Sequence, residues 1–230
     1  MAAIVKMAAE AEDGEGGQRL SGVAYTRILE TLFDRRIPTG AFVSQNELVD
    51  LLGIPIAAVR DALKLLESEG IVTIHPRSGI QFVKPGLELV RSTFQYRTIL
   101  ERAAVAVYAE TGDEAEFAKI ERQHLAAIEE IEQSGLTDGV LRELDELEQV
   151  LHNAVIHSLG NPLIERAYGR IHNYLRIIRL DRKLTPPLAL RSLREHMQIV
   201  LACKARDPEA AVAALQMHFS AAMQRNMGLY

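Results

Sequence analysis

Apolar residues recur at intervals of three or four over most of the 230-residue chain, which predicts packed helices rather than a sandwich or barrel. A first helix is expected over about residues 21–36. Its candidates for burial are Val23, Ile28, Leu29 and Leu32. The stretch SQNELVDLLG predicts a short second helix, because Ser44 and Glu47 match a capping box and Gly53 suits a helix end.

A third helix and a β-hairpin are expected next. The helix begins near Pro55, a residue that suits a first helical turn, and stops at Gly70. After it, the β-rich runs IVTIH and IQFV are joined by PRSG, in which Pro and Gly favour a hairpin turn. Three helices followed by a hairpin predict a winged helix-turn-helix domain over residues 20–84.

Helices are also expected throughout the rest of the chain, after a boundary at Lys84, Pro85 and Gly86. The breakers TGD, SGLTDG, LGNP, LTPP and RDP separate six segments of about twenty residues. The expected helices cover about 87–111, 113–133, 138–158, 163–183, 188–206 and 208–227. Because short connections imply antiparallel neighbours, residues 87–230 are expected to form a helical bundle, and the fold class is mainly α.

Composition fits a soluble globular protein, with 48% hydrophobic and 25% charged residues. Residues 1–19 lack periodicity and are expected to form a flexible acidic tail. No apolar run suits a membrane span and the start lacks a secretory pattern, so a cytoplasmic protein is expected. The single cysteine, Cys203, is expected to be a small core residue. A net charge of −5 argues against indiscriminate DNA binding but does not exclude a small domain that binds specific DNA.

Three histidines have a spacing that suggests a common site. In a helical hairpin folded about Asp207, His196 lies eleven residues before the turn and His218 eleven after it, so both reach similar heights. Glu148 and His152, four residues apart, project from one face of another helix. This set suits Zn²⁺, Ni²⁺ or Mn²⁺, whereas the alternative is separate histidines that are each hydrogen-bonded elsewhere.

The remaining histidines are weaker candidates for ligands. His157 and His172 have no matching partner across a predicted hairpin, His124 is expected to be solvated, and His75 belongs to the wing strand. An enzymatic alternative also stays open, because a metal held by imidazoles can lower the pKa of a bound water and support hydrolysis. Against a hydrolase, no separate acid or base is spaced to lie beside the metal.

At this point residues 20–227 resemble the GntR-type bacterial transcription regulators of the FadR subfamily, with an FCD-type effector-binding domain. The runs that carry the resemblance are SQNELVDLLGIPIAAVRDALKLLESEGIVTIHPRSGIQFV, YRTILERAAVAVYA, LEQVLHNAVIHSLGNPLI and LREHMQIVLACKARDPEAAVAALQMH. The resemblance implies a homodimeric regulator, more often a repressor, that binds an operator in double-stranded DNA. It also implies a helical domain that binds a divalent metal and a small organic acid or related metabolite.

The family's metal pattern is an acidic residue four positions before a histidine, followed by two histidines on the last helices. In this chain the pattern falls on Glu148, His152, His196 and His218, the same residues that the spacing brings together. Zinc is the first expectation, with nickel or manganese as alternatives. Members commonly have Asp at the first position, so the longer Glu148 is a departure.

The resemblance further implies an effector cavity beside the metal. Arg97, in the run YRTILE, is expected to bind an effector carboxylate, because a guanidinium fork matches that group. The alternative is an ion pair with Glu101 one helical turn away. Arg170 and Asn173 are expected to face the same cavity, as are the nearby His172 and Arg176.

The sequence of the predicted DNA-binding domain, residues 20–84, departs further from the family's pattern. Pro55 and Ile56 occupy the positions of a common Ser-Arg pair, and Asn46 occupies that of a phosphate-binding Arg. The expected DNA contacts are Ser44, Gln45, Asn46, Ile56, Ala57, Arg60, Arg77 and Ser78. Residues 20–84 hold seven basic and seven acidic residues, so weak binding with a shallow salt dependence is expected. The alternative is a metabolite-binding protein that has lost specific DNA recognition.

Overall fold

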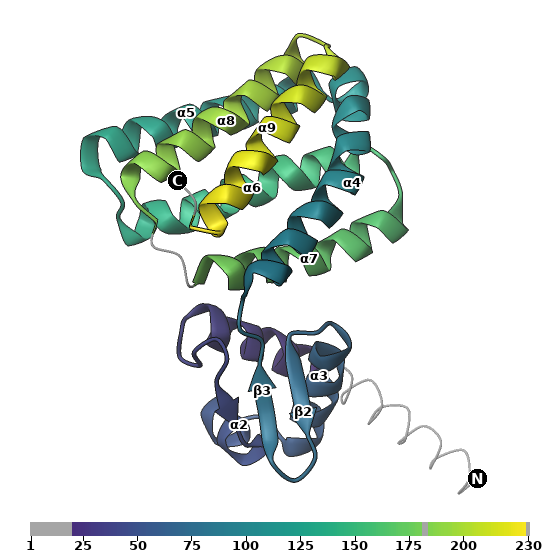
Figure 1. Cartoon of the computed structure of the whole chain (residues 1–230), viewed down its shortest axis with the longest axis vertical. Coiled ribbons are helices and arrows are strands. Elements are labelled where there is room, and N and C mark those ends of the chain that lie inside the picture. Colours follow the sequence, from purple (N-terminus) through teal and green to yellow (C-terminus); the bar gives the residue numbers. More distant parts are fainter. Residues whose placement is uncertain (1–19, 181–183, 229–230) are drawn as a thin grey trace, which may run out of the picture. The chain divides into compact units, whose positions relative to one another are not determined.

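The computed structural model describes residues 20–180 and 184–228. The expected tail at residues 1–19 lies outside this range, as does the expected end of the helix at residue 183. The chain divides into two compact units, and the boundary between them in the sequence lies between Pro85 and Gly86 (Figure 1). Helices dominate the described residues, which confirms the prediction of a mainly α fold.

The first unit is a winged helix-turn-helix, as predicted. Its elements are a helix over 20–33, β1 (Phe42–Val43), α2 (Gln45–Leu52), α3 (Ile56–Ser68), β2 (Val72–His75) and β3 (Gly79–Phe82). The strands form an antiparallel sheet in the order β1-β3-β2, with His75 opposite Gly79 at the turn of the wing. Strand β1 was not predicted, because two residues become a strand only by pairing with β3.

The expected helix ends form as local chemistry requires. The Ser44 hydroxyl accepts a bond of 3.1 Å from the Glu47 amide, and the Glu47 carboxylate accepts one of 2.6 Å from the Ser44 amide. Gly53 ends α2 with a φ of 65°, in the left-handed region that favours glycine. This cap fixes the sharp turn between α2 and α3.

One expected core residue of the first helix is wrong. Val23 is 42% exposed, whereas Ala24, Ile28 and Leu32 are fully buried. These three residues follow at intervals of four and define the inward face of the helix, which turns Val23 toward solvent. The other expected core residue, Leu29, is buried beside this stripe.

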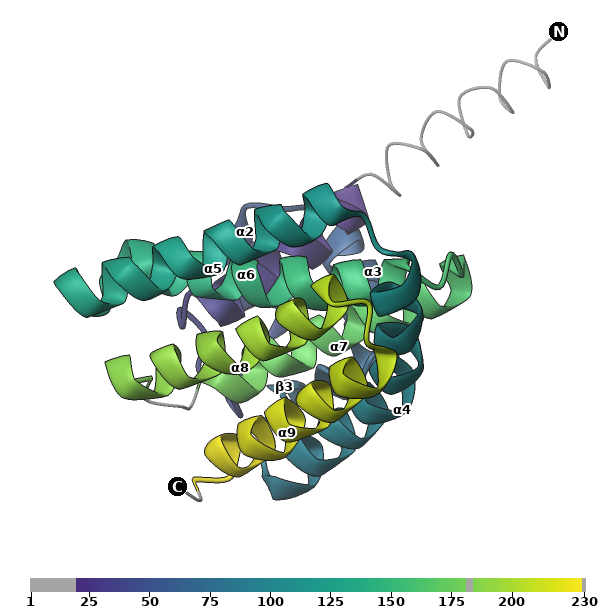
Figure 2. The same cartoon turned by 90° about the horizontal axis from the view of Figure 1, so that it is seen from above.

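The second unit is the predicted helical bundle. Its helices are α4 (Leu87–Thr111), α5 (Glu114–Ser134), α6 (Asp138–His157), α7 (Pro162–Leu180), α8 (Pro186–Lys204) and α9 (Pro208–Asn226). Figure 2 shows α9 beside both α4 and α8. Cys203 is buried in the core, as expected. Among the described residues, none of the helices has the length and apolar character that a membrane span requires.

Gly79 provides a test of the sheet that holds the wing. Its φ is 139°, and an added Cβ would lie 2.7 Å from both the Phe42 ring and the Val43 carbonyl oxygen of β1. We expect Gly79→Ala to lower the free energy of unfolding by about 1–3 kcal/mol in denaturant titrations of the full chain. Gly22→Ala, in a helix with open space around it, is the control and should cause no loss. Equal stability of the two variants would contradict this role for β1.

Candidate metal centre and DNA-binding surface

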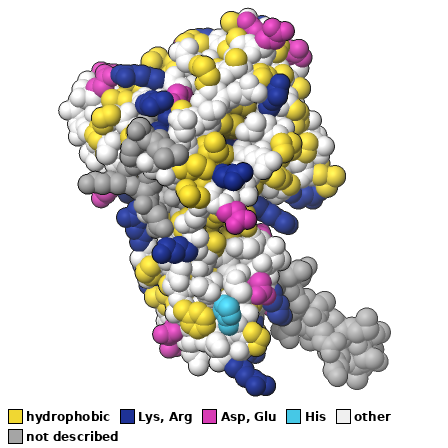
Figure 3. All heavy atoms as spheres, in the orientation of Figure 1, with side chains coloured by type: hydrophobic (Ala, Val, Ile, Leu, Met, Phe, Trp, Pro, Cys, Tyr) yellow, Lys and Arg dark blue, Asp and Glu magenta, His cyan; other side chains and the backbone are white. Residues whose placement is uncertain are grey.

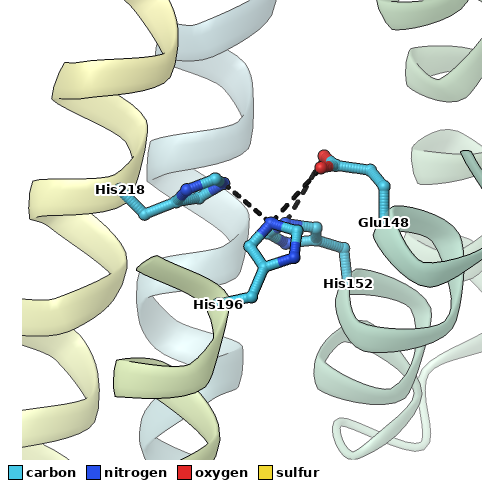
Figure 4. A group of neighbouring side chains, drawn as sticks. All are labelled: Glu148, His152, His196 and His218. Carbon is cyan, nitrogen blue, oxygen red and sulfur yellow. Dashed lines mark hydrogen bonds and ion pairs between the residues drawn. The ribbon is translucent and has the colours of Figure 1, made fainter. Parts of the chain in front are cut away.

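Four buried side chains meet inside the second unit. Glu148 and His152 come from α6, His196 from α8 and His218 from α9, and their ligand atoms lie within 4.8 Å of one another (Figure 4). Each is at most 5% exposed. The sequence-predicted set is therefore brought together, and separate histidines on different faces are ruled out for these residues.

The α8–α9 hairpin places two of these histidines at one height. Asp207 caps α9 by accepting a bond of 2.9 Å from the Ala210 amide, which fixes the turn between the helices. His196 and His218 are each eleven residues from Asp207, and their Nε2 atoms lie 3.3 Å apart. The symmetric spacing about Asp207 thus has the consequence expected from the sequence.

The outer nitrogens of two imidazoles contact carboxylates that were not predicted as partners of these histidines. His152 Nδ1 pairs with Glu101 of α4, and His218 Nδ1 lies 3.0 Å from an oxygen of Glu195 on α8. Burial alone would raise the pKa of both carboxyl groups. Neighbouring Arg97 and His152 instead lower the pKa of Glu101 to about 2. His218 and Arg225 lower that of Glu195 to about 2 in the same way. Ionised carboxylates only accept hydrogen bonds, so each histidine donates from Nδ1.

The outer nitrogen of His196 contacts His124 of α5 at 3.1 Å. The expectation that His124 is solvated is wrong: its side chain is fully buried, because the face of α5 that holds it packs against α8. Burial, and next the imidazole of His196, lower the pKa of His124 to about 4. Burial, and next the imidazole of His218, lower the pKa of His196 to about 3. Both imidazoles are therefore neutral near pH 7.

This pattern leaves lone pairs on the inner nitrogens. With protons on the Nδ1 atoms, the Nε2 atoms of all three histidines are acceptors. Those of His152 and His196 face the Glu148 carboxylate, that of His218 faces His196 Nε2, and His152 Nε2 is buried without a hydrogen-bond partner. The Glu148 oxygens lie 3.4 Å from Nε2 of His152 and of His196. An ion with tetrahedral bonds of about 2.0–2.1 Å sets neighbouring donor atoms roughly 3.3–3.4 Å apart. The donor set and its spacing therefore fit a divalent metal.

Arginines match the buried carboxylates around this cluster. Arg97 Nε lies 2.7 Å from Glu101, and Glu148 contacts both Arg97 and Arg179 at 3.0 Å. Burial would raise the pKa of Glu148, but Arg179, His152 and Arg97 hold it well below its usual value. Arg225 makes bonds of 2.7 and 2.6 Å to the two oxygens of Glu195. The positive charges of the arginines thus offset the carboxylates.

The residues expected to bind an effector lie in different environments. Arg97 forms the alternative ion pair with Glu101, packs 4.5 Å from the Phe219 ring centroid, and keeps Nη2 buried without a hydrogen-bond partner. On α7, Arg170 is exposed and Asn173 is half-buried. The α7 arginine that contacts the cluster is Arg179, which the sequence analysis did not single out.

The two other histidines of this unit do not belong to the group of four, although His172 interacts electrostatically with Glu148 and His152. His172 Nε2 is 2.8 Å from the Asn153 side-chain oxygen, and burial lowers the pKa of His172 to about 4. His157 is exposed and lies 2.9 Å from Glu165. Both are thus poorly placed as ligands, in line with their weaker spacing.

The expected DNA contacts of α2 and α3 lie near one another. Ile56, Ala57 and Arg60 are exposed on α3, and Arg60 Nε donates a bond of 3.1 Å to the Gln45 side chain at the start of α2. Asn46 is exposed on the same turn of α2. Helix α3 therefore presents an apolar first turn and Arg60 to solvent.

The wing supplies the remaining expected contacts. Arg77 and Ser78 are exposed in the turn between β2 and β3, and the Arg77 backbone has a φ of 65°. Ser44 is half-buried, and its hydroxyl oxygen already caps α2. On the face drawn in Figure 3, basic and acidic side chains are interspersed and neither sign forms a continuous patch.

Comparisons with known proteins agree with this architecture. Residues 92–221 match the FCD domain, and residues 20–82 match the bacterial regulatory proteins of the gntR family. The HTH-type transcriptional regulator YdhC of Bacillus subtilis is 24% identical over 196 residues, which cover 85% of this chain and 86% of YdhC. The HTH-type transcriptional repressor NanR of Citrobacter rodentium is 25% identical over 198 residues, or 77% and 73% of the two chains.

Solved structures show the same fold. E. coli McbR/YncC superposes with a TM-score of 0.71 at 19% identity, covering 91% of this chain and 96% of the other. A GntR-type regulator from Rhodococcus sp. RHA1 gives a TM-score of 0.74 at 19% identity, with coverages of 94% and 99%. Both matching families are transcriptional regulators rather than enzymes, so the hydrolase alternative is not retained. The chain belongs to the GntR family of bacterial transcriptional regulators with an FCD domain, an architecture that fits the FadR subfamily.

Proposed function

We propose that this regulator is a homodimeric, metal-containing repressor whose affinity for an operator in double-stranded DNA changes when a small organic acid or related metabolite binds the helical domain. The observation that carries the metal and ligand part is the group of buried acceptor atoms that face one another. A two-fold dimer presents two reading helices to a pseudo-palindromic site. The name of the NanR relative supports repression, and a role on bacterial DNA implies the cytoplasm.

The proposed ligands of the metal are Glu148, His152, His196 and His218. Three imidazoles and one carboxylate suit zinc first, with nickel or manganese as alternatives. A bound ion supplies a link between α6, α8 and α9 and two added positive charges. Because the ligands lie on separate helices, the free energy of metal binding also stabilises the folded unit.

The balance of charge around the cluster favours an anionic effector. Glu101, Glu148 and Glu195 already contact arginines, so the added charge of a divalent ion has no internal counterpart. Within the helical domain, Arg97 Nη2 is a buried donor that a ligand carboxylate would satisfy. We assign further contacts with the effector to Arg170 and Asn173 of α7.

The exposed start of α3 supports a DNA-reading role. Pro55 precedes the helix without a side-chain cap, so backbone N–H groups of the first turn remain for a phosphate. Ile56 and Ala57 suit contact with thymine methyl groups, and Arg60 suits a base edge or a phosphate. Phosphate and base contacts from Ser44, Gln45 and Asn46 of α2 and from Arg77 and Ser78 of the wing complete the proposed surface.

The metal proposal predicts a specific loss in one variant. His218→Ala should remove stoichiometric metal, measured by elemental analysis, and should abolish the rise in Tm that added zinc produces in metal-stripped wild-type protein. The exposed His157→Ala is the control and should retain both properties. Wild-type protein that holds no metal after purification without chelators, and that shows no Tm shift with zinc, would refute the site.

The effector proposal predicts that metal and anion binding are coupled. Acetate and succinate should bind the metal-loaded protein more tightly than the metal-stripped protein, by about 5–150-fold for a typical coupling energy. Acetamide and succinamide, which lack the charge, should not show this difference. Arg170→Ala and Asn173→Ala should weaken carboxylate binding while the metal content stays constant. Equal binding of acids and amides would exclude an anion site.

The DNA proposal predicts that Arg60 is needed for operator affinity. With the protein's own upstream region as probe, Arg60→Ala should weaken binding by about 1–3 kcal/mol, or roughly 5–150-fold. Arg36→Ala, an exposed arginine beyond the first helix, is the charge-matched control and should have a smaller effect. Equal wild-type affinity for the upstream region and scrambled DNA would instead favour the loss of sequence-specific recognition.

A further inference from the structure

His124 is a fully buried imidazole outside the proposed ligand set. It projects from α5 toward α8, where its ring meets that of His196 edge-on with centroids 5.3 Å apart. Its two nitrogens have different partners: Nδ1 lies 2.8 Å from the Ile120 carbonyl oxygen, and Nε2 lies 3.1 Å from His196 Nδ1. Both nitrogens are therefore hydrogen-bonded, and the ring is held on two sides.

The carbonyl partner determines where the protons lie. A carbonyl oxygen only accepts, so His124 Nδ1 carries a proton and donates it to Ile120. A neutral imidazole has one N–H group, which leaves a lone pair on His124 Nε2. That lone pair accepts the proton of His196 Nδ1, and His196 Nε2 is left as an acceptor that faces Glu148.

The three proposed histidine ligands thus have two kinds of outer partner. His152 and His218 donate to the carboxylates of Glu101 and Glu195, whereas His196 donates to a neutral ring. A carboxylate partner orients the imidazole, raises its basicity and adds a negative charge. A neutral acceptor orients the ring equally well but leaves the charge of the cluster unchanged.

We propose that His124 is a positioning residue of the metal centre, which holds His196 in the tautomer that presents Nε2 to the ion without adding negative charge to the site. This inference rests on the proposed metal site. It also explains why a histidine occupies a buried position on α5 among core residues such as Ile120 and Ala127. If a carboxylate took the place of His124, beside those of Glu101 and Glu195, it would offset part of the positive charge of the metal ion that attracts an anionic effector.

Three substitutions separate the roles of shape, acceptor and charge. His124→Phe keeps the bulk of the ring but removes the acceptor. His124→Gln places an amide oxygen near the position of Nε2 and restores an acceptor. His124→Glu supplies an acceptor that also carries a negative charge. The exposed His157→Gln is the matched control for loss of a histidine.

The experiment measures the dissociation constant for zinc with a competing chelator, on full-length metal-stripped protein. We expect His124→Phe to weaken zinc binding by about 10–100-fold, and His124→Gln to recover most of that loss. His124→Glu should bind zinc at least as tightly as wild type, yet lose most of the acetate affinity of the zinc-loaded protein. Nitrogen NMR of His196 should show a proton on Nδ1 in wild type and a mixture of tautomers in His124→Phe.

The outcomes distinguish this inference from the proposed function. If wild-type protein does not bind zinc, the proposed metal site fails and the inference fails with it. If wild type binds zinc but His124→Phe binds it equally well, His124 has no positioning role. If His124→Gln and His124→Phe lose the same affinity, the histidine acts by packing rather than as an acceptor, and the inference is overturned.

Discussion

The burial of one carboxylate against three imidazole lone pairs is the constraint on which the helical unit depends. Acceptors that face one another in a low-dielectric interior repel, and removing them from water is costly without compensation. The chain supplies part of this compensation through Arg97 and Arg179, which hold Glu148 ionised. Among the described residues, the Nε2 atoms of the three histidines have no positively charged partner, because each ring carries its proton on Nδ1 and donates it outward. The proposed divalent ion would complete this arrangement.

The same constraint explains the layout of the surrounding helices. Each outward imidazole nitrogen needs an acceptor on another turn or helix, and α4, α5 and α8 provide them with Glu101, His124 and Glu195. The arginines that neutralise the carboxylates come from α4, α7 and α9. All six helices of the bundle therefore contribute to one polar centre, and the apolar core packs around it.

Most of the architecture was accessible from the sequence, because it depends on local signals. Breakers such as LTPP and the capping box of Ser44 fix helix limits within a few residues. The proximity of the four proposed ligands follows from helical periodicity and the hairpin about Asp207. The outward partners were not accessible, since Glu101 and His152 are 51 residues apart and meet only through packing. For the same reason His124 looked solvated, as one buried histidine on a charged helix gives no local signal. The effector and operator contacts remain predictions.

The distribution of the proposed metal ligands along the chain has a consequence for biosynthesis. His218 follows Glu148 by 70 residues, so the ribosome completes α6 long before α9 exists. Until α9 emerges, a nascent chain offers at most three of the four donor groups, without the third imidazole that closes the set. High-affinity loading of the proposed site would therefore coincide with docking of α9 against α4 and α8. On the proposed metal site, an ion would be acquired only by chains whose helical unit has been translated and folded as far as its final helix.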